Sequence, residues 1–420
     1  MALTRRGMLL STGGALAAGT LPIRQALAAA PEGNDLKFIF VMNYGGWDPT
    51  RIFATEFDNP SVDMERDSWR ASAGNLDFVE HAGRPAVSEY LQNHHARTTF
   101  LNGVLVSSVA HENCLRISMT GSTAQDRSDW GAILGGQRTD RYTLPQIVVG
   151  GPSFPGDYGT SVTRTGTSGQ LEALLSGDII SWSDLPVDAP DWRAEDVMDR
   201  YLQGRTAAAA DNARSPELAA LRASYQLAVD RSLELKDLQR VVDWSGATSF
   251  SGQARLAVDL LALDISRVAT LQFSYYGWDT HASNDIYQSY NFQQLFTELN
   301  NLTNMLQTTA GTTQPTLADE TVVVVLSEMG RTPALNAQDG KDHWPYTSVM
   351  ITGPGFAGDR VVGGYDLNYY GLPIDLASGD TVDEGTLLSS DVVGATLLAA
   401  ADIDPAPFTS GIKPLTAVLD

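Results

Sequence analysis

The sequence predicts an α/β protein with a largely parallel central sheet. Short, continuous apolar runs alternate along the chain with longer segments that have helical periodicity. The clearest of these runs, at 321–326, reads Thr-Val-Val-Val-Val-Leu. Runs of this kind are typical of strands covered by helices on both faces, because neither face of such a strand meets water.

The predicted elements follow one another in βα order in both halves of the chain. The N-terminal half is predicted to contain a strand at 37–43 closed by two glycines, a helix at 86–96, and strands at 98–106 and 144–149. The C-terminal half is predicted to contain a helix at 253–266, a strand at 269–275, an amphipathic helix at 287–308, strands at 321–326 and 348–352, and a helix within 387–401.

The middle of the chain interrupts this alternation. Residues 156–246 contain no strong strand run, and residues 216–244 form a long helical pattern rich in Ala, Leu, Arg and Glu. We therefore expect a mostly helical insertion or cap at 152–250. The α/β core would then comprise residues 29–151 and 251–420.

The first 28 residues have the features of an export signal. Arg5-Arg6 precedes a weakly apolar run that ends at Ala26-Leu27-Ala28, the small-x-small pattern that signal peptidase recognises. The segment at 4–9 resembles the twin-arginine consensus, so we expect export by the twin-arginine translocase and a periplasmic or secreted protein. Neither this run nor any later stretch is long and apolar enough to span a bilayer, so no membrane insertion is expected after signal removal.

The charge of the chain argues against two classes of partner. The net charge is −22 at pH 7, and removing residues 1–28 takes away three arginines and no acid, which gives −25. Nucleic acid and anionic lipid both require a basic surface, so we expect no nucleic-acid partner. The single cysteine, Cys114, cannot form an intramolecular disulfide and is expected to be a small buried residue rather than a nucleophile.

Four short motifs stand at or just beyond the ends of predicted strands. They are GGWD at 45–48, GWDTH at 277–281, SEMGR at 327–331 and KDHW at 341–344. Open α/β sheets place their ligands in loops at the carboxyl ends of strands. The carboxylates and imidazoles of these motifs suit a divalent cation, with zinc expected first and manganese or calcium as alternatives.

The spacing of the acids and histidines favours shared coordination of an ion. Asp279 and His281 are two residues apart on one loop, so both side chains can reach the same ion. Asp342 and His343 are adjacent, so one can coordinate while the other orients a ligand. A lone aspartate after a strand is usually a turn or cap residue, and it is the four motifs together that indicate a metal site. The tryptophans beside the motifs either wall the pocket or belong to the core.

Taken in order after the twin-arginine start, these motifs resemble the domain of unknown function 1501 family of exported bacterial proteins. The resemblance covers nearly the whole mature chain, and SEMGR followed by DHW is quite specific. That family is itself similar to the alkaline phosphatase and sulfatase superfamily. The resemblance therefore implies an alkaline-phosphatase-like three-layer core, with a mixed, largely parallel sheet, and a two-metal site. A fold of this kind does not by itself establish an activity.

The resemblance also assigns roles to individual residues. Asp48 occupies the place of the superfamily's first metal-binding aspartate. Asp279 and His281 resemble the Asp and His of one metal site, and His343 resembles that site's later histidine. Glu328 would supply a carboxylate to the second metal.

Two departures from the superfamily pattern bear on activity. Met329 stands where a metal-binding histidine is expected, and alignment on Thr120-Gly121 puts His111 at the position of the nucleophile. Three roles are open to His111: completing the second metal site, acting as a nucleophile on phosphorus, or capping a helix. Arg331 either holds a non-bridging phosphate or sulfate oxygen or forms a salt bridge that fixes its loop.

Two functions remain open from the sequence. The first is a metal-dependent hydrolase of phosphate or sulfate esters, in which one ion activates water or a nucleophile and the other stabilises the leaving oxygen of an anionic ester substrate. The second is a non-catalytic, metal-binding periplasmic protein that binds a partner or polymer on a degenerate phosphatase-like fold. The set of acids and histidines favours the first, whereas Met329 and the missing Ser, Thr or Cys nucleophile favour the second.

Overall fold

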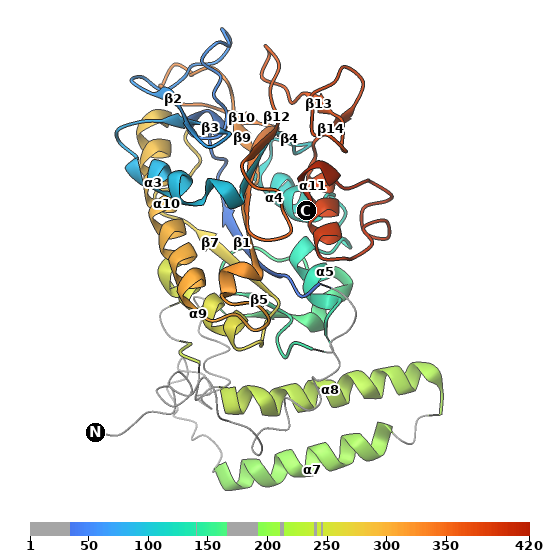
Figure 1. Cartoon of the computed structure of the whole chain (residues 1–420). Coiled ribbons are helices and arrows are strands. Elements are labelled where there is room, and N and C mark those ends of the chain that lie inside the picture. The colour runs from blue at the N-terminus through green and yellow to red at the C-terminus, as the bar shows by residue number, and fades with distance from the viewer. Residues whose placement is uncertain (1–33, 140, 166–191, 211–213, 239–241, 245–246) are drawn as a thin grey trace, which may run out of the picture. The chain divides into compact units, whose positions relative to one another are not determined.

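A computed structural model describes residues 34–139, 141–165, 192–210, 214–238, 242–244 and 247–420 (Figure 1). The expected signal peptide at 1–28 lies outside the described residues. The described chain divides into two compact units. One comprises residues 32–164 and 247–420, and the other contains the described part of residues 165–246.

The larger unit is built around one eight-stranded sheet. Its strands, in spatial order, are β12 (Arg360–Gly363), β4 (Thr98–Leu105), β11 (Tyr346–Thr352), β8 (Thr321–Ser327), β1 (Lys37–Asn43), β7 (Val268–Phe273), β5 (Gln146–Val148) and β6 (Val162–Arg164). Strand β11 is antiparallel to both of its neighbours, whereas the other pairings in the sheet are parallel. The predicted α/β class with a mixed, largely parallel sheet is therefore confirmed.

Helices cover both faces of this sheet, which gives three layers (Figure 1). One face carries α3 (Pro85–His94), α9 (Phe250–Ala262) and α10 (Asn284–Thr308). The other face carries α4 (His111–Thr120), α5 (Trp130–Gly136) and α11 (Ser390–Ala400). Alternate residues of β1, among them Phe38 and Phe40, pack with Trp130 and Leu397 on the second face. All seven residues of β1 are buried, as expected for a central parallel strand.

Smaller elements complete the larger unit. Two-stranded sheets pair β2 (Trp69–Ala73) with β3 (Leu76–Glu80), β9 (Gly330–Arg331) with β10 (His343–Trp344), and β13 (Pro373–Ile374) with β14 (Thr386–Leu387). Short 3₁₀ helices are η1 (Pro49–Arg51), η2 (His95–Arg97), η3 (Gly156–Ser161), η4 (Leu317–Asp319) and η5 (Thr416–Val418). The pairing of β9 with β10 matters for the site, because it sets His343 opposite Arg331.

The smaller unit contains two long helices, α7 (Trp192–Ala210) and α8 (Pro216–Leu238). They lie antiparallel, since Lys236 near the end of α8 pairs with Glu195 at 2.6 Å and with Asp199 at 2.8 Å near the start of α7. The insertion expected at 152–250 begins later in the structure, because β6 pairs with β5 and thereby joins the central sheet. None of the described helices combines the length and the apolar character that a membrane span requires.

Candidate metal centre

The loops that carry the predicted motifs meet at one edge of the sheet. Strands β8, β1 and β7 are adjacent and parallel, so their carboxyl ends lie side by side. Gly45 has a φ of +124°, and a Cβ on it would lie 2.8 Å from the backbone nitrogen of Asp279. Only glycine allows this close approach of two loops, and the approach brings Asp279 into the site.

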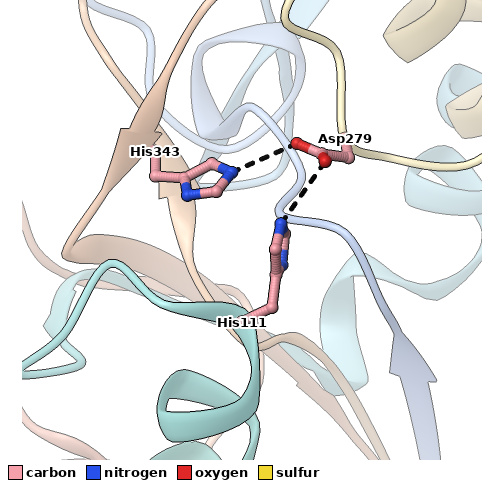
Figure 2. A group of neighbouring side chains, drawn as sticks. All are labelled: His111, Asp279 and His343. Carbon is pink, nitrogen blue, oxygen red and sulfur yellow. Dashed lines mark hydrogen bonds and ion pairs between the residues drawn. The ribbon is translucent and has the colours of Figure 1, made fainter.

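Three side chains from three different elements converge there (Figure 2). Asp279 Oδ2 lies 3.4 Å from His111 Nε2, at the start of α4, and Asp279 Oδ1 lies 3.2 Å from His343 Nε2, on β10. The three ligand atoms all lie within 4.8 Å of one another. Among the described residues, these three side chains therefore form a group that could hold a metal ion.

A third histidine lies at the exposed side of this group. His281 Nε2 is 3.1 Å from Asp279 Oδ1 and 3.1 Å from His343 Nε2. Its Nδ1 lies 2.7 Å from Asp342 Oδ1. Asp342 therefore contacts the group through His281, in the orienting position that the sequence left open for one residue of the Asp342–His343 pair.

Hydrogen bonds at Nδ1 determine which ring nitrogen of each histidine faces the group. His111 Nδ1 is 2.7 Å from Glu328 Oε1, and His343 Nδ1 is 2.7 Å from the carbonyl oxygen of Val109. Carbonyl and carboxylate oxygens only accept hydrogen bonds, so the proton of each neutral ring belongs on Nδ1. Each Nε2 then presents a lone pair toward Asp279.

This arrangement suits a cation. The lone pairs of three imidazoles and the oxygens of a carboxylate meet within hydrogen-bond distance, and all of them are acceptors. The Nε2 atom of His111 is buried and has no hydrogen-bond partner. An unpartnered buried nitrogen is costly unless a proton or a metal ion engages it. The donor set, imidazole nitrogens and a carboxylate, is one that zinc binds in proteins.

Charge in the site keeps the acid ionised. Partial burial would raise the pKa of Asp279, but the Arg331 guanidinium at 2.7 Å outweighs it and, with His343 and His111, holds the pKa at about 2. The pKa of His111 is raised, chiefly by its hydrogen bond to Glu328, although burial opposes the shift. A carboxylate that stays charged at neutral pH is ready to bind a cation.

Glu328, expected to bind the second metal, is placed behind His111. The side chain is fully buried, and its oxygens accept hydrogen bonds from the nitrogen of Gly45 at 2.8 Å and from that of Gly46 at 3.2 Å. The Ser327 hydroxyl donates a further bond at 3.1 Å. Because these donors and His111 occupy both oxygens, Glu328 orients His111 rather than facing an ion.

Asp48, the expected first metal-binding aspartate, stands apart from the group. Its carboxylate lies 2.9 Å from Lys341 Nζ, 2.9 Å from Asn284 Nδ2 and 2.6 Å from the Thr50 hydroxyl. Burial would raise the pKa of Asp48, but Lys341 and Arg51 outweigh it and hold the pKa well below its usual range. Asp48 thus caps η1 and neutralises a buried lysine, and we leave it out of the site.

Arg331 takes the salt-bridge role that the sequence left as one of two alternatives. Its guanidinium is fully buried and donates to the carbonyl oxygens of Gly46 at 2.8 Å and Lys341 at 3.0 Å, to that of Gly45, and to Asp279. These bonds join the loops that follow β1, β7 and β8. An arginine engaged in this way positions Asp279 instead of reaching a substrate.

The remaining motif residues lie in the core. Met329 packs against Val106, Cys114 and Ile117, so the place of the expected second-site histidine is an apolar cluster. Cys114 is buried, as predicted, and burial raises the pKa of its thiol to about 11. Trp47 and Trp278 are fully buried core residues, whereas Trp344 is half-buried and stacks on Tyr370.

Sequence reasoning missed two contributors to the site. Tyr44 lies with its ring centroid 5.4 Å from that of His111, and the carbonyl oxygen of Val109 holds His343. Tyr44 directly precedes the Gly45-Gly46 pair, a position that could have drawn attention to it. A backbone carbonyl leaves no signal in the sequence.

The fold and the group of side chains define an α/β protein with a candidate metal centre at the carboxyl edge of its sheet. The chain belongs to the family described as "Protein of unknown function (DUF1501)", whose family model matches residues 80–413. The family expected from the motifs is therefore confirmed. The matched range includes His111, Asp279 and His343, and it begins after Asp48.

Solved structures with a similar fold have low sequence identity to this chain. The structure of Ps i-CgsB in complex with k-i-k-neocarrahexaose is 9% identical in sequence, with a TM-score of 0.38. The superposition covers 90% of this chain and 75% of the Ps i-CgsB chain. A protein in the alkaline phosphatase superfamily from Vibrio parahaemolyticus is 8% identical in sequence, with a TM-score of 0.38. The superposition covers 91% of this chain and 74% of the Vibrio chain. No curated protein is significantly similar to the sequence.

Proposed function

We propose that the protein binds one divalent ion between His111, Asp279 and His343, with His281 as a further ligand, and hydrolyses an ester of phosphate or sulfate. The observation that carries the proposal is the set of Nδ1 hydrogen bonds. They turn Nε2 of His111, His281 and His343 toward one ionised carboxylate. Zinc is the ion that suits this donor set first, with manganese as the alternative. Calcium, which takes oxygen ligands, suits it less.

The exposure of the site favours catalysis over a purely structural ion. The side chains of Asp279 and His281 are 46% and 50% exposed, whereas those of His111 and His343 are about one-fifth exposed. Structural zinc sites are closed, and catalytic sites keep a position open to water or substrate. A bound ion would supply Lewis acidity toward an ester oxygen and would lower the pKa of water. The residues of the chain would hold the ion, keep Asp279 ionised and fix the tautomer of each histidine.

One ion fits the chain better than the two expected from the superfamily. Met329 is buried in an apolar cluster, Asp48 is neutralised by Lys341, and the oxygens of Glu328 are occupied by hydrogen-bond donors. Glu328 was the carboxylate expected for the second ion, Met329 stands where a histidine of that site was expected, and Asp48 occupies the place of the first metal-binding aspartate. Their engagement elsewhere supports a centre that would hold a single ion, and that ion would supply Lewis acidity toward an ester oxygen.

The alternative is a metal-binding protein without activity, and one observation favours it. Cys114, the only thiol, is buried in the core, and no serine or threonine hydroxyl among the described residues forms a hydrogen bond with the His111–Asp279–His343 group. A covalent intermediate on the protein would need such a group or His111 itself. Hydrolysis by water needs none, so the two functions differ in turnover and not in metal content.

Elemental analysis of the mature protein, purified without added metal, tests the proposal. We expect about one zinc or manganese ion per chain, and loss of that ion in an Asp279→Ala/His281→Ala variant. The matched control is Glu89→Ala/His95→Ala, which removes an exposed acid and a histidine outside the group. If the metal-loaded protein hydrolyses phosphate or sulfate esters and the metal-free protein does not, the result supports the hydrolase. A folded protein that holds no metal would overturn both functions. A metal-loaded protein that hydrolyses no ester would overturn the hydrolase and support the non-catalytic metal-binding protein.

We also propose export by the twin-arginine translocase, on the strength of residues 1–28. Replacing Arg5 and Arg6 by lysine should retain the precursor in the cytoplasm. Normal appearance of the variant in the periplasm or medium would contradict this route.

A further inference from the structure

Three exposed tyrosines, two of them on the loop that leads to Asp279, form a packed cluster. The rings of Tyr275, Tyr276 and Tyr290 have centroids 4.9, 5.6 and 5.2 Å apart, and the side chains are 54%, 63% and 41% exposed. Ile286 and Tyr287, also exposed, lie within one helical turn of Tyr290 on α10. Large apolar side chains gathered on a surface mark a binding site more often than scattered ones do.

The cluster belongs to the same loop as the proposed ligands. Tyr276 precedes Asp279 by three residues, which span at most about 11 Å of extended chain. Asn291 on α10 fixes this loop, because its side chain donates to the carbonyl oxygen of Gly277 at 2.6 Å and accepts from the nitrogen of Tyr276 at 3.3 Å. The Cα atoms of Tyr276 and Asp279 therefore lie at most about 11 Å apart, so one extended ligand can reach both.

We propose that Tyr275, Tyr276 and Tyr290 bind a sugar ring of the substrate, so that the ester cleaved at the metal centre is carried on a saccharide. This inference rests on the proposed function for the position of the ester group. A sugar ring has a face of C–H groups that packs on the negative face of an aromatic ring, and its hydroxyl rim remains in water. Tyrosine supplies rigid contact area at low cost in conformational entropy, and its hydroxyl adds hydrogen bonds.

The surroundings disfavour other occupants. The rings pack on one another and lie open to solvent, so the cluster covers only one face of a ligand. An aryl or alkyl group bound there would keep its other apolar face in water. A stable protein interface needs about 20 to 30 residues a side, far more than this cluster offers. The net charge of −22 opposes a polyanion away from the ion. A largely uncharged saccharide meets each of these conditions.

Affinity electrophoresis of the full mature protein tests the cluster without depending on turnover. The probes are soluble neutral polysaccharides in the gel: dextran, laminarin, xyloglucan and galactomannan. We expect at least one of them to retard the wild-type protein, and a Tyr275→Ala/Tyr276→Ala variant to lose roughly tenfold in affinity. Tyr201→Ala is the matched control, because Tyr201 is equally exposed but belongs to the smaller unit.

Two further measurements separate the outcomes. Metal content should be unchanged in the double variant, and hydrolysis of methyl phosphate reports the metal centre without the tyrosines. Retardation that the double variant loses supports the sugar site even if no ester is hydrolysed, in which case only the proposed hydrolysis fails. The sugar site is overturned if no polysaccharide retards the protein, or if the double variant is retarded equally. It is also overturned if the tyrosines instead hold two copies of the chain together, so that the wild-type protein is a dimer and the double variant is a monomer.

Discussion

Nδ1 of His111 lies 2.7 Å from Oε1 of Glu328, a contact between residues that are 217 positions apart in the chain. The contact connects the first turn of α4 to the loop after β8. It fixes the ring of His111 so that the unpartnered Nε2 faces Asp279. A buried acid that sets the tautomer of a ligand contributes to affinity without touching the ion.

Replacing Glu328 by glutamine should therefore weaken metal binding. The amide keeps the shape of the side chain but removes the negative charge that stabilises the Nδ1 proton of His111, and loss of such support costs about 10- to 100-fold in affinity. Competition with a chromophoric chelator measures the dissociation constant. Glu112→Gln removes an exposed acid one residue from His111 and should leave it unchanged. Equal affinity in the Glu328→Gln variant would show that the hydrogen bond has no such role.

The two histidines that contact Asp279 Oδ1 should differ in importance. His343 has a side chain only 22% exposed and is held by the Val109 carbonyl oxygen, whereas His281 is 50% exposed and is held by the exposed Asp342. Exposed pairs are worth little because solvent screens them. We expect His343→Gln to abolish stoichiometric metal binding and His281→Gln to reduce affinity only partly. Isothermal titration with zinc would reveal the order, and the reverse order would contradict the assignment.

Restoring a histidine at position 329 should not create a second metal site. Met329 packs against Val106 and Cys114, so Met329→His buries an imidazole without a partner and should cost about 1–3 kcal/mol of unfolding free energy. Met329→Leu conserves volume and should cost less than about 1.5 kcal/mol. Chemical denaturation measures both losses, and elemental analysis counts the ions. A second ion in the Met329→His variant would mean that this position faces the site after all.

The approach of two loops at Gly45 should be essential for the metal centre. Gly45→Ala strains a backbone with φ of +124° and brings a Cβ to 2.8 Å from the nitrogen of Asp279. Strain of this kind costs about 1–3 kcal/mol, and it displaces Asp279 as well. Gly277→Ala is the control, because φ is +85° there but no atom lies within 4 Å of the added Cβ. Both variants should lose stability, and only Gly45→Ala should also lose metal affinity.

Acid should weaken the protein through a buried ion pair remote from the metal centre. Burial would raise the pKa of Glu320, but Lys37 at 2.9 Å and the N–H groups of Thr312 and Thr313 outweigh it and hold the pKa at about 2, against an ordinary value of 4.5. A carboxyl with a lowered folded-state pKa stabilises the protein above its unfolded-state value. This contribution is lost as pH falls from 4.5 toward 2.

Glu320→Gln should accordingly cost up to about 3 kcal/mol at pH 7, because it leaves the buried Lys37 with only the longer ion pair to Asp264 at 3.4 Å. The difference from the wild-type protein should shrink below pH 4.5, where the wild-type carboxyl also gains its proton. Urea unfolding at pH 7, 5 and 3 measures it, with exposed Glu89→Gln as the control. A difference that stays constant with pH would rule out this carboxylate as the source.

The sequence alone located most of the elements and the edge of the sheet at which the site forms. The strand predicted at 37–43 matches β1, and the run at 321–326 lies within β8, because continuous apolar runs are a local property of buried strands. Helix α5 was missed, since its seven residues are too few to show a helical period. The family followed from the motifs, because loops at strand ends keep recognisable sequences.

Only the tertiary structure decided which acids face the site. Asp48 and Asp279 both follow a buried strand and look equivalent in the sequence, yet Asp48 pairs with Lys341 while Asp279 meets His111 and His343. The difference arises from partners that are 64 to 293 positions away, which no local pattern encodes. Likewise, the direction in which Glu328 points depends on the nitrogens of Gly45 and Gly46, whose positions are set by the packing of β1 against β8. Residue types and strand ends are local properties, whereas the direction of a side chain is fixed by the contacts that the folded chain brings to it.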